Sequence, residues 1–189
     1  SDRFVSSFAA RRQHNRFIID TAMDNLERMA AAMRQMISAG KFRPAAVEVD
    51  FGMQNAGLGL FELELSDGSK LRLKGKIDRI DLADSDNGKA ALVFDYKLSG
   101  NSFDWAGLYY GLDIQLALYL AALRNCGGQI ASQISVPAGA FYLPIEVSAN
   151  STGLDDYEKK AAKFDYKAKG ILDGRFVYTV DGAGSGEYY

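Results

Sequence analysis

Hydrophobic residues recur at helical spacing in the first part of the chain and alternate with polar residues after it. The helical pattern covers residues 10–39 and predicts one long amphipathic helix. Gly40 and Pro44 mark its end, since neither residue continues a helix easily. The apolar face that we expect this helix to bury consists of Met23, Leu26, Ala30, Met33 and Ile37.

Alternation with a period of two predicts half-buried strands in the following segment. Turns rich in Gly, Asp and Asn separate them, which is typical of strands that follow one another in a sheet. The predicted strands are 46–51, 60–65, 70–82 and 90–98. The last two flank a polar turn over residues 84–89 that contains an Asn-Gly step, and we expect them to form a hairpin.

A second helical pattern covers residues 105–124, with leucines at 108, 112, 116 and 120 on one face. Gly127 and Gly128 end it. The remaining predicted elements are a core strand over 138–147, a charged helix over 155–167, a short strand from Ile171 and a frayed end over 181–187. This order predicts a single domain over residues 1–189, built from one sheet with helices against it.

The hairpin at 75–97 carries the candidate chemistry. Asp95 and Lys97 are two residues apart on one strand, so their side chains share a face. Asp78, on the partner strand, faces Asp95 if the turn centres on residues 86 and 87, and Lys97 if it centres one residue later. Either register gathers two carboxylates and an ammonium among apolar side chains. Metal-dependent phosphodiester hydrolysis needs such a set: oxygen ligands and a cation near the phosphate.

These groups also have an ordinary structural reading. Asp78 and Arg79 could form an ion pair at a strand end, and Asp95 and Lys97 could form a salt bridge within one strand. The functional reading gains weight from the helix that follows, because Gln115 and Tyr119 are four residues apart and project from one of its faces.

Composition and charge narrow the class of protein. With 48% hydrophobic residues, the 189-residue chain can bury one core. No apolar run reaches the roughly 20 residues of a membrane span, and no signal peptide is recognisable, so we predict a cytoplasmic protein without a membrane partner. Cys126, the only cysteine, excludes an internal disulfide within the chain. Because the net charge is −2, nucleic-acid binding requires local basic patches.

Several motifs together resemble the RecB-type nuclease domain of the PD-(D/E)XK superfamily. They are Gly75-Lys76-Ile77-Asp78, Asp95-Tyr96-Lys97 and the Tyr-Tyr-Gly-Leu-x-x-Gln-Leu-x-x-Tyr-Leu segment at 109–120. Within that group, segments at 42–49, 99–104, 137–142 and 167–172 are similar to the bacterial AddB (RexB) family. The resemblance covers nearly the whole chain and implies a restriction-endonuclease-like α/β fold, a mixed central sheet flanked by helices.

The resemblance also implies a role for each motif residue. Asp78, Asp95 and the main-chain carbonyl of Tyr96 would ligate Mg²⁺ or Mn²⁺, which prefer oxygen ligands. Lys97 would orient or help deprotonate the attacking water and offset charge on the phosphate, and Gln115 would lie beside them. The resemblance implies that Tyr119 supports the DNA path, and we predict Lys76 and Arg79 as further DNA-binding residues.

The implied activity is a metal-dependent exodeoxyribonuclease in double-strand-break repair and recombination. It would cut single-stranded DNA, on the 5′-ended strand, as a partner helicase unwinds the double-stranded substrate. The implied partner is an AddA-type helicase–nuclease subunit, and no Gly-x-x-x-x-Gly-Lys-Ser/Thr loop for ATP is present in this chain. The alternative is a catalytically inactive nuclease fold that binds DNA or scaffolds the helicase complex.

Two features of the family have no counterpart in this sequence. RecB-type nucleases have a metal-ligating histidine on an upstream helix, but the only histidine, His14, matches the helix after that position. AddB proteins hold a 4Fe-4S cluster through cysteines on both sides of the nuclease domain, and Cys126 matches none of them, so we read it as a helix-end residue without a redox role. We therefore expect a domain excised from a longer subunit, with weak metal occupancy and weak or absent activity on its own.

Other residues keep two readings each. Glu48 either supports the metal site or, as we favour, lies on the wet face of its strand. Tyr109 and Tyr110 either stack on bases or, as we favour, pack their helix against the protein. A basic face of the predicted 70–82 strand forms either a DNA backbone track or a solvated edge; its residues are Arg72, Lys74 and Lys76.

Overall fold

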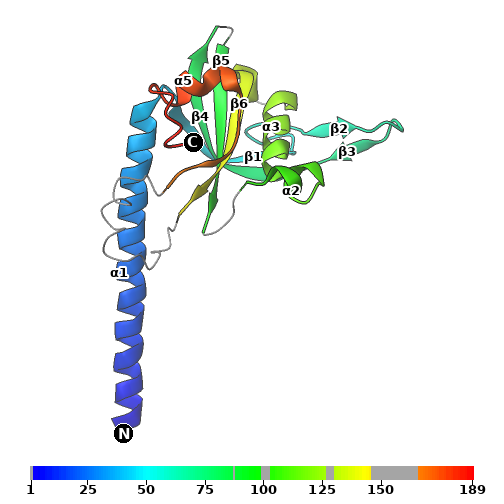
Figure 1. Cartoon of the computed structure of the whole chain (residues 1–189). Coiled ribbons are helices and arrows are strands. Elements are labelled where there is room, and N and C mark those ends of the chain that lie inside the picture. The colour runs from blue at the N-terminus through cyan, green and yellow to red at the C-terminus, as the bar shows by residue number, and fades with distance from the viewer. Residues whose placement is uncertain (1, 87, 99–102, 127–129, 146–165) are drawn as a thin grey trace.

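The computed structural model of the chain describes residues 2–86, 88–98, 103–126, 130–145 and 166–189, the first fourteen of these by backbone alone. Its main element is a five-stranded sheet in the order β1-β4-β5-β6-β7 (Figure 1). β5 and β6 run parallel and the other neighbours antiparallel, so the sheet is mixed, as predicted. The strands are β1 (Arg43–Phe51), β4 (Gly75–Ser85), β5 (Gly88–Lys97), β6 (Ile134–Pro144) and β7 (Lys169–Leu172).

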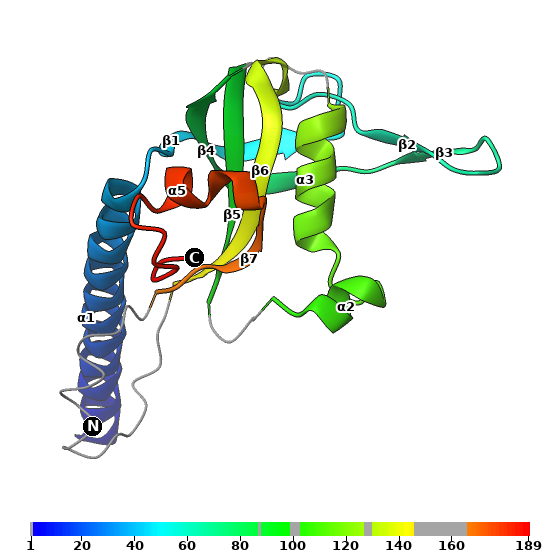
Figure 2. The ribbon, with the colours of Figure 1, turned by 45° about the horizontal axis from the view of Figure 1, so that its top comes forward.

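Helices pack on both faces of this sheet (Figure 1, Figure 2). The C-terminal part of α1 (Asp2–Ala39) and α5 (Val177–Val180) contribute to the core on one face, and α3 (Gln115–Asn125) to the core on the other. The predicted α/β class is therefore confirmed. The short helical elements are α2 (Trp105–Tyr109), η1 (Ala131–Gln133) and η2 (Gly174–Phe176). In the described part of the chain, no helix has the length and apolarity that a membrane span requires.

The side chains of β5 alternate between the two cores. Ala91 and Val93 lie in the core beneath α3, while Leu92 and Phe94 lie in the core that α1 shares. Both faces of this strand are therefore buried, as the sequence predicts. The polar residues at the end of β5 continue the same alternation, so Asp95 lies on the same face as Ala91 and Val93, towards α3.

The first helix begins earlier than predicted and buries a different stripe. Met29, Ala32 and Met36 are buried, whereas Met23 and Leu26 of the predicted face are exposed. The reason is visible in Figure 1: only the C-terminal part of α1 reaches the sheet, and its N-terminal part extends away from it. Helical periodicity alone carries no information on where along its length a helix meets its neighbours.

Two predicted elements are each divided in the structure. The predicted 70–82 strand is interrupted after Arg72, so β3 (Lys70–Arg72) pairs with β2 (Glu62–Glu64) in a separate ribbon while β4 joins the main sheet. The predicted 105–124 helix is interrupted at Gly111, whose φ of +71° suits glycine far better than other residues. Gln115 consequently begins α3 instead of lying inside a longer helix.

Cys126 is the buried C-cap residue of α3, and this confirms the expected helix-end position. Burial raises the pKa of its thiol, which disfavours the reactive thiolate. The predicted helix over 155–167 lies outside the described residues.

The C-terminal segment is folded back on the protein, and the prediction of a frayed end is wrong. The buried carboxylate of Asp181 accepts hydrogen bonds from the main-chain N–H of Ala183 (3.1 Å), Ser185 (2.9 Å) and Gly186 (3.2 Å), and from the Ser185 hydroxyl (2.6 Å). Tyr189 then packs edge-on against Phe141 of the core, with ring centroids 5.2 Å apart. The glycine-rich segment 181–187, predicted to be frayed, forms a tight turn around the carboxylate of Asp181.

Replacing Asp181 by alanine should lower the free energy of unfolding by about 1–3 kcal/mol, because three main-chain N–H groups and the Ser185 hydroxyl lose their shared acceptor. The hydrogen bond from Ser185 holds the pKa of Asp181 below its ordinary value. Its contribution is therefore present above the unfolded-state pKa, about 3.9, and is lost as pH falls through the lower, folded-state pKa. Chemical denaturation at several pH values measures both effects. An alanine variant with the wild-type stability at neutral pH would contradict this account.

Candidate active site

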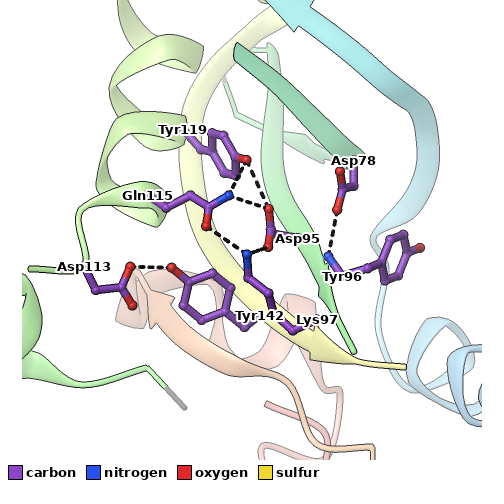
Figure 3. Close-up of polar contacts among 8 residues, drawn as sticks. All are labelled: Asp78, Asp95, Tyr96, Lys97, Asp113, Gln115, Tyr119 and Tyr142. Carbon is purple, nitrogen blue, oxygen red and sulfur yellow. Dashed lines mark hydrogen bonds and ion pairs between the residues drawn. The ribbon is translucent and has the colours of Figure 1, made fainter. Parts of the chain in front are cut away.

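The β4–β5 register decides how the candidate residues face one another. Ser85 pairs with Gly88 and Arg79 with Phe94, so the turn centres on residues 86 and 87. Continuing this register by one residue puts Asp78 opposite Asp95, the first of the two predicted arrangements. The main-chain N–H of Tyr96 donates to Asp78 Oδ2 at 2.8 Å, which fixes that carboxylate against the neighbouring strand (Figure 3).

Gln115 joins the two functional groups of β5. Its Oε1 accepts a hydrogen bond from Lys97 Nζ at 2.9 Å, and its Nε2 donates to Asp95 Oδ1 at 2.7 Å (Figure 3). An ammonium only donates and a carboxylate only accepts, so the amide can satisfy both in one orientation only. Lys97 Nζ also lies 2.5 Å from Asp95 Oδ2. The break in the predicted helix makes this bridge possible by setting Gln115 at the first turn of α3.

Tyr119 supports the Asp95 carboxylate from within the core. Its hydroxyl donates to Asp95 Oδ1 at 3.0 Å and accepts from Gln115 Nε2 at 2.7 Å. Burial, aided by the charge of Asp95, raises the pKa of Tyr119 to about 12, so the phenol keeps its proton at neutral pH. The phenol is buried, so its demonstrated contact is with Asp95, although the resemblance assigns it to the DNA path.

The remaining oxygen of Asp95 suits a metal ion. Asp95 Oδ2 is buried and has no hydrogen-bond partner among the described residues. Lys97 Nζ lies at ion-pair distance from it, but not in the geometry of a hydrogen bond. Asp78 keeps a second oxygen beyond the one that Tyr96 contacts. Among the described side chains, no group of three or more His, Cys, Asp or Glu gathers at one point. A hard cation here would take two carboxylates and fill its shell with main-chain oxygen, water or substrate.

A cleft of about 460 Å³ opens beside these residues. One wall is the start of β4, residues 74–76, and the other is the segment 112–115 that leads from α2 into α3; Phe51, Leu118 and Tyr119 complete the lining. Gly75 permits this shape, because a Cβ there would lie 2.6 Å from the ring of Phe51. Gln115 thus belongs both to the polar network and to the cleft.

Arg79 does not lie where the DNA-binding prediction needs it. The residue is 4% exposed, its guanidinium donates to both oxygens of Asp81, and it stacks 4.8 Å from the centre of the Phe94 ring. Its partner is therefore Asp81, not Asp78, and the proposed Asp78–Arg79 pair is wrong as well. A buried guanidinium offers no surface for a phosphate.

The basic track along residues 72–76 is not one face of a regular strand. Arg72 lies on β3 and pairs with Glu62, whereas Lys76 lies on β4 and pairs with Glu48 at 2.9 Å. Glu48 is exposed, which confirms its reading as a solvent-facing residue, and its φ of +52° lies in the left-handed region, which is uncommon outside glycine. Lys76 and Lys74 both line the cleft, so their prediction as DNA contacts stays open.

Sequence reasoning missed a second polar pair near Lys97. The hydroxyl of Tyr142 donates to Asp113 Oδ1 at 2.5 Å, and Lys97 Nζ lies 5.0 Å from the centre of the Tyr142 ring (Figure 3). Burial, followed by the Asp113 bond, raises the pKa of Tyr142. Tyr142 sits in an apolar β6 pattern and Asp113 in a predicted helix, so neither carried a signal. His14 lies on α1, and its side chain is outside the described part.

Comparison with known proteins agrees with this geometry. The sequence model of the PD-(D/E)XK nuclease superfamily matches residues 2–181. The B-type subunit of an ATP-dependent helicase/deoxyribonuclease from Symbiobacterium thermophilum is 30% identical over 97% of this chain, and its counterpart in Clostridium tetani is 33% identical over 86%. The matched regions make up only 16% and 14% of those two proteins.

Proposed function

The chain belongs to the PD-(D/E)XK nuclease superfamily, and on this premise we propose that it hydrolyses phosphodiester bonds of DNA with a divalent metal ion. The observation that carries the proposal is the Gln115 amide, which joins the Lys97 ammonium to the Asp95 carboxylate. Together with Asp78 across the hairpin, these are the groups that hydrolysis of a phosphodiester requires.

The metal would be held where β4 begins and β5 ends. Asp78, Asp95 and the main-chain carbonyl of Tyr96 are the proposed ligands, because Mg²⁺ and Mn²⁺ prefer oxygen and keep several waters. When bound, the ion supplies Lewis-acid stabilisation and lowers the pKa of water. The buried Oδ2 of Asp95, without a hydrogen bond in the described structure, supports Asp95 in this role.

Lys97 supplies the positive charge that the substrate meets. Its side chain is partly exposed, so a phosphate can reach Nζ while Asp95 and Gln115 hold its direction. We propose that the ammonium stabilises the negative charge that develops on the phosphate and orients the attacking water. Tyr119 holds Asp95 in place through its hydroxyl and also lines the cleft, so the DNA contact that the resemblance assigns to it remains a prediction.

The names of the relatives suggest the larger setting. They are subunits of ATP-dependent helicase/deoxyribonucleases and are much longer than this chain. We propose that the chain is the nuclease domain of such a subunit, in the cytoplasm, with an AddA-type partner that unwinds double-stranded DNA. The domain would then act as an exonuclease on the single strand produced in double-strand-break repair, and a 4Fe-4S cluster would be held by cysteines outside this chain.

Cleavage of end-labelled single-stranded DNA by the assembled helicase–nuclease tests this function. We expect products with Mg²⁺ or Mn²⁺ and none with a chelator, while circular single strands persist because they offer no end. Ca²⁺ is the matched control: it has the same charge but prefers more ligands at longer distances, so we expect little cleavage. Products in the chelator contradict metal dependence. No products with either metal would favour an inactive fold that binds DNA or scaffolds the helicase.

Tyr142 should matter through its ring more than through its hydroxyl. Replacing it by leucine removes the π-face beside Lys97 and should lower the single-turnover cleavage rate by about three- to tenfold. Replacing it by phenylalanine keeps the ring, so the rate should stay within about twofold, while loss of the bond to Asp113 should cost about 1 kcal/mol of stability. Equal rates for the leucine and phenylalanine variants would contradict a positioning role for the ring.

A further inference from the structure

The short helix α2 presents aromatic side chains to solvent and buries none of its residues. Trp105 is 65% exposed, Tyr109 84% and Tyr110 73%, so the interpretation of the two tyrosines as packing residues is wrong. Leu112, directly after α2, is equally exposed. Large apolar side chains that gather on a surface and stay mostly exposed mark an interaction site.

This aromatic surface, defined here as Trp105, Tyr109 and Tyr110, is continuous with the cleft of the active site. Three residues of the segment that leaves α2, from Leu112 to Ile114, line the cleft, and Gln115 follows them directly. Figure 2 shows α2 at the end of α3 where that helix begins. A strand that enters the cleft from this side therefore meets α2 before it meets Gln115, which contacts Lys97.

The surface is held in shape before any ligand binds. The Asp104 carboxylate accepts hydrogen bonds from the N–H of Ala106 and Gly107, at 3.2 and 2.9 Å, and so caps α2. Trp105 packs edge-on against Phe103 at 4.9 Å, and Phe103 in turn packs on the core beneath α3. Tyr109 and Tyr110 pack edge-to-face with each other at 5.2 Å. Because these contacts already hold the rings, a ligand that binds their exposed faces loses little further conformational entropy of the protein.

The opposite wall of the cleft has the complementary charge. Lys74 and Lys76 line it and both are exposed; Lys76 also pairs with Glu48 at 2.9 Å, in an exposed ion pair that a phosphate can replace. Aromatic faces on one side and ammonium groups on the other match the bases and the phosphates of a single nucleic-acid strand. A protein partner would account for the apolar side chains but not for the lysines across the cleft.

We propose that Trp105, Tyr109 and Tyr110 stack on the bases of single-stranded DNA as it enters the active-site cleft. The inference rests on the proposed function for its substrate class, and it adds a base-binding site beside the phosphate chemistry. Stacking is tolerant of sequence, since every base has a π-face. The site therefore selects unpaired strands, whose bases are free to stack, over duplex DNA.

Trp105 is the only tryptophan of the chain, so its fluorescence reports on this surface directly. With the 189-residue chain in a chelator, an oligothymidylate of about ten nucleotides, within the site size of single-strand-binding domains, should quench the signal. An abasic strand with the same number of phosphates should quench it far less. Equal quenching by the two strands would overturn the proposal, because it would mean that phosphates alone are bound.

Variants of the two tyrosines test the same surface without altering the reporter. Tyr109→Leu and Tyr110→Leu keep apolar bulk but lose the π-face, and each should weaken oligothymidylate binding by about five- to hundredfold. Tyr178→Leu is the matched control, since Tyr178 is an exposed tyrosine on α5, and it should bind like wild type. Wild-type affinity in both α2 variants would overturn the proposal.

The Asp95→Asn variant separates this inference from the proposed function. Oligothymidylate should quench the fluorescence of this variant as in wild type, although the variant should cleave DNA about a hundred- to thousandfold more slowly. If the wild-type chain binds thymidylate over the abasic strand yet the assembled helicase–nuclease never cleaves, the nuclease proposal fails and the stacking site stands. If it cleaves while the α2 variants bind normally, only the stacking site is overturned.

Discussion

Replacing Asp95 by asparagine will lower the rate of DNA cleavage by about a hundred- to thousandfold, the range seen when one preorganised electrostatic group is removed from an active site. Asparagine has nearly the same shape, so the contacts of Gln115 and Tyr119 with this position can persist in part. The charge that would bind a divalent cation is lost, however, and Lys97 loses its ion-pair partner. Single-turnover cleavage with saturating Mn²⁺ measures the effect.

Asp84 provides the matched control for this substitution. It lies on the same hairpin, but its side chain is exposed and pairs with Lys89 near the turn. Asp84→Asn should therefore cleave at the wild-type rate. The melting temperature of Asp95→Asn should stay within about 4 °C of wild type, a shift of roughly 1 kcal/mol. Unchanged cleavage in a folded Asp95→Asn protein would remove Asp95 from the catalytic machinery.

The second large effect concerns stability. Arg79→Leu should destabilise the protein by about 3–5 kcal/mol, because it leaves the Asp81 carboxylate buried without its partner. The two side chains are almost fully enclosed, at 5% and 3% exposure, so solvent cannot replace the lost interaction. Urea denaturation followed by circular dichroism measures the change. A loss below about 1 kcal/mol, the value of an exposed pair, would contradict the burial seen here.

The double variant Arg79→Leu/Asp81→Leu should recover most of that loss, because a buried ion pair gains little over apolar side chains of similar volume.

Burial already raises the pKa of Asp81, despite the hydrogen bond from Arg79. A raised folded-state pKa means that protonation favours the folded form. The stabilisation that comes from protonated Asp81 is present below the unfolded-state pKa and is lost as pH rises through the folded-state pKa. Arg79→Leu should therefore be least destabilising in acid.

Local patterns were sufficient for the parts of the site that one hairpin contains. Alternation along β5 put Asp95 and Lys97 on one face, and the turn residues limited Asp78 to two positions, of which the structure has one. Gln115 came from the family resemblance, and its position beside Lys97 holds in the structure. In each case the spacing within one or two neighbouring elements fixes the geometry, so the sequence contains the answer.

Errors arose where burial and turn geometry decide, because periodic spacing reports neither. Arg79 carries a charge and was assigned to DNA, but its partner Asp81 and the Phe94 ring make burial possible. Leucine spacing across 105–124 suggested one helix, and Gly111 divides it because the chain must turn to bring Gln115 to Asp95. Asp181 looked like part of a flexible tail, yet four hydrogen bonds to one carboxylate order it.

The parallel pairing of β5 with β6 has a consequence for the order in which the site forms. The β4–β5 hairpin closes a short loop, and such structures form in about 1–10 μs. Parallel pairing must wait until the whole connection through α2 and α3 has folded, because loop-closure entropy is spent before the contacts that repay it exist. We therefore expect Asp78 and Asp95 to face each other early in folding, before Gln115 arrives and adds its hydrogen bond to the Lys97–Asp95 pair. A newly made chain would bring Asp78 and Asp95 together first. The Lys97 ammonium would gain its hydrogen bond to Gln115 only when the connection through α2 and α3 packs on the sheet.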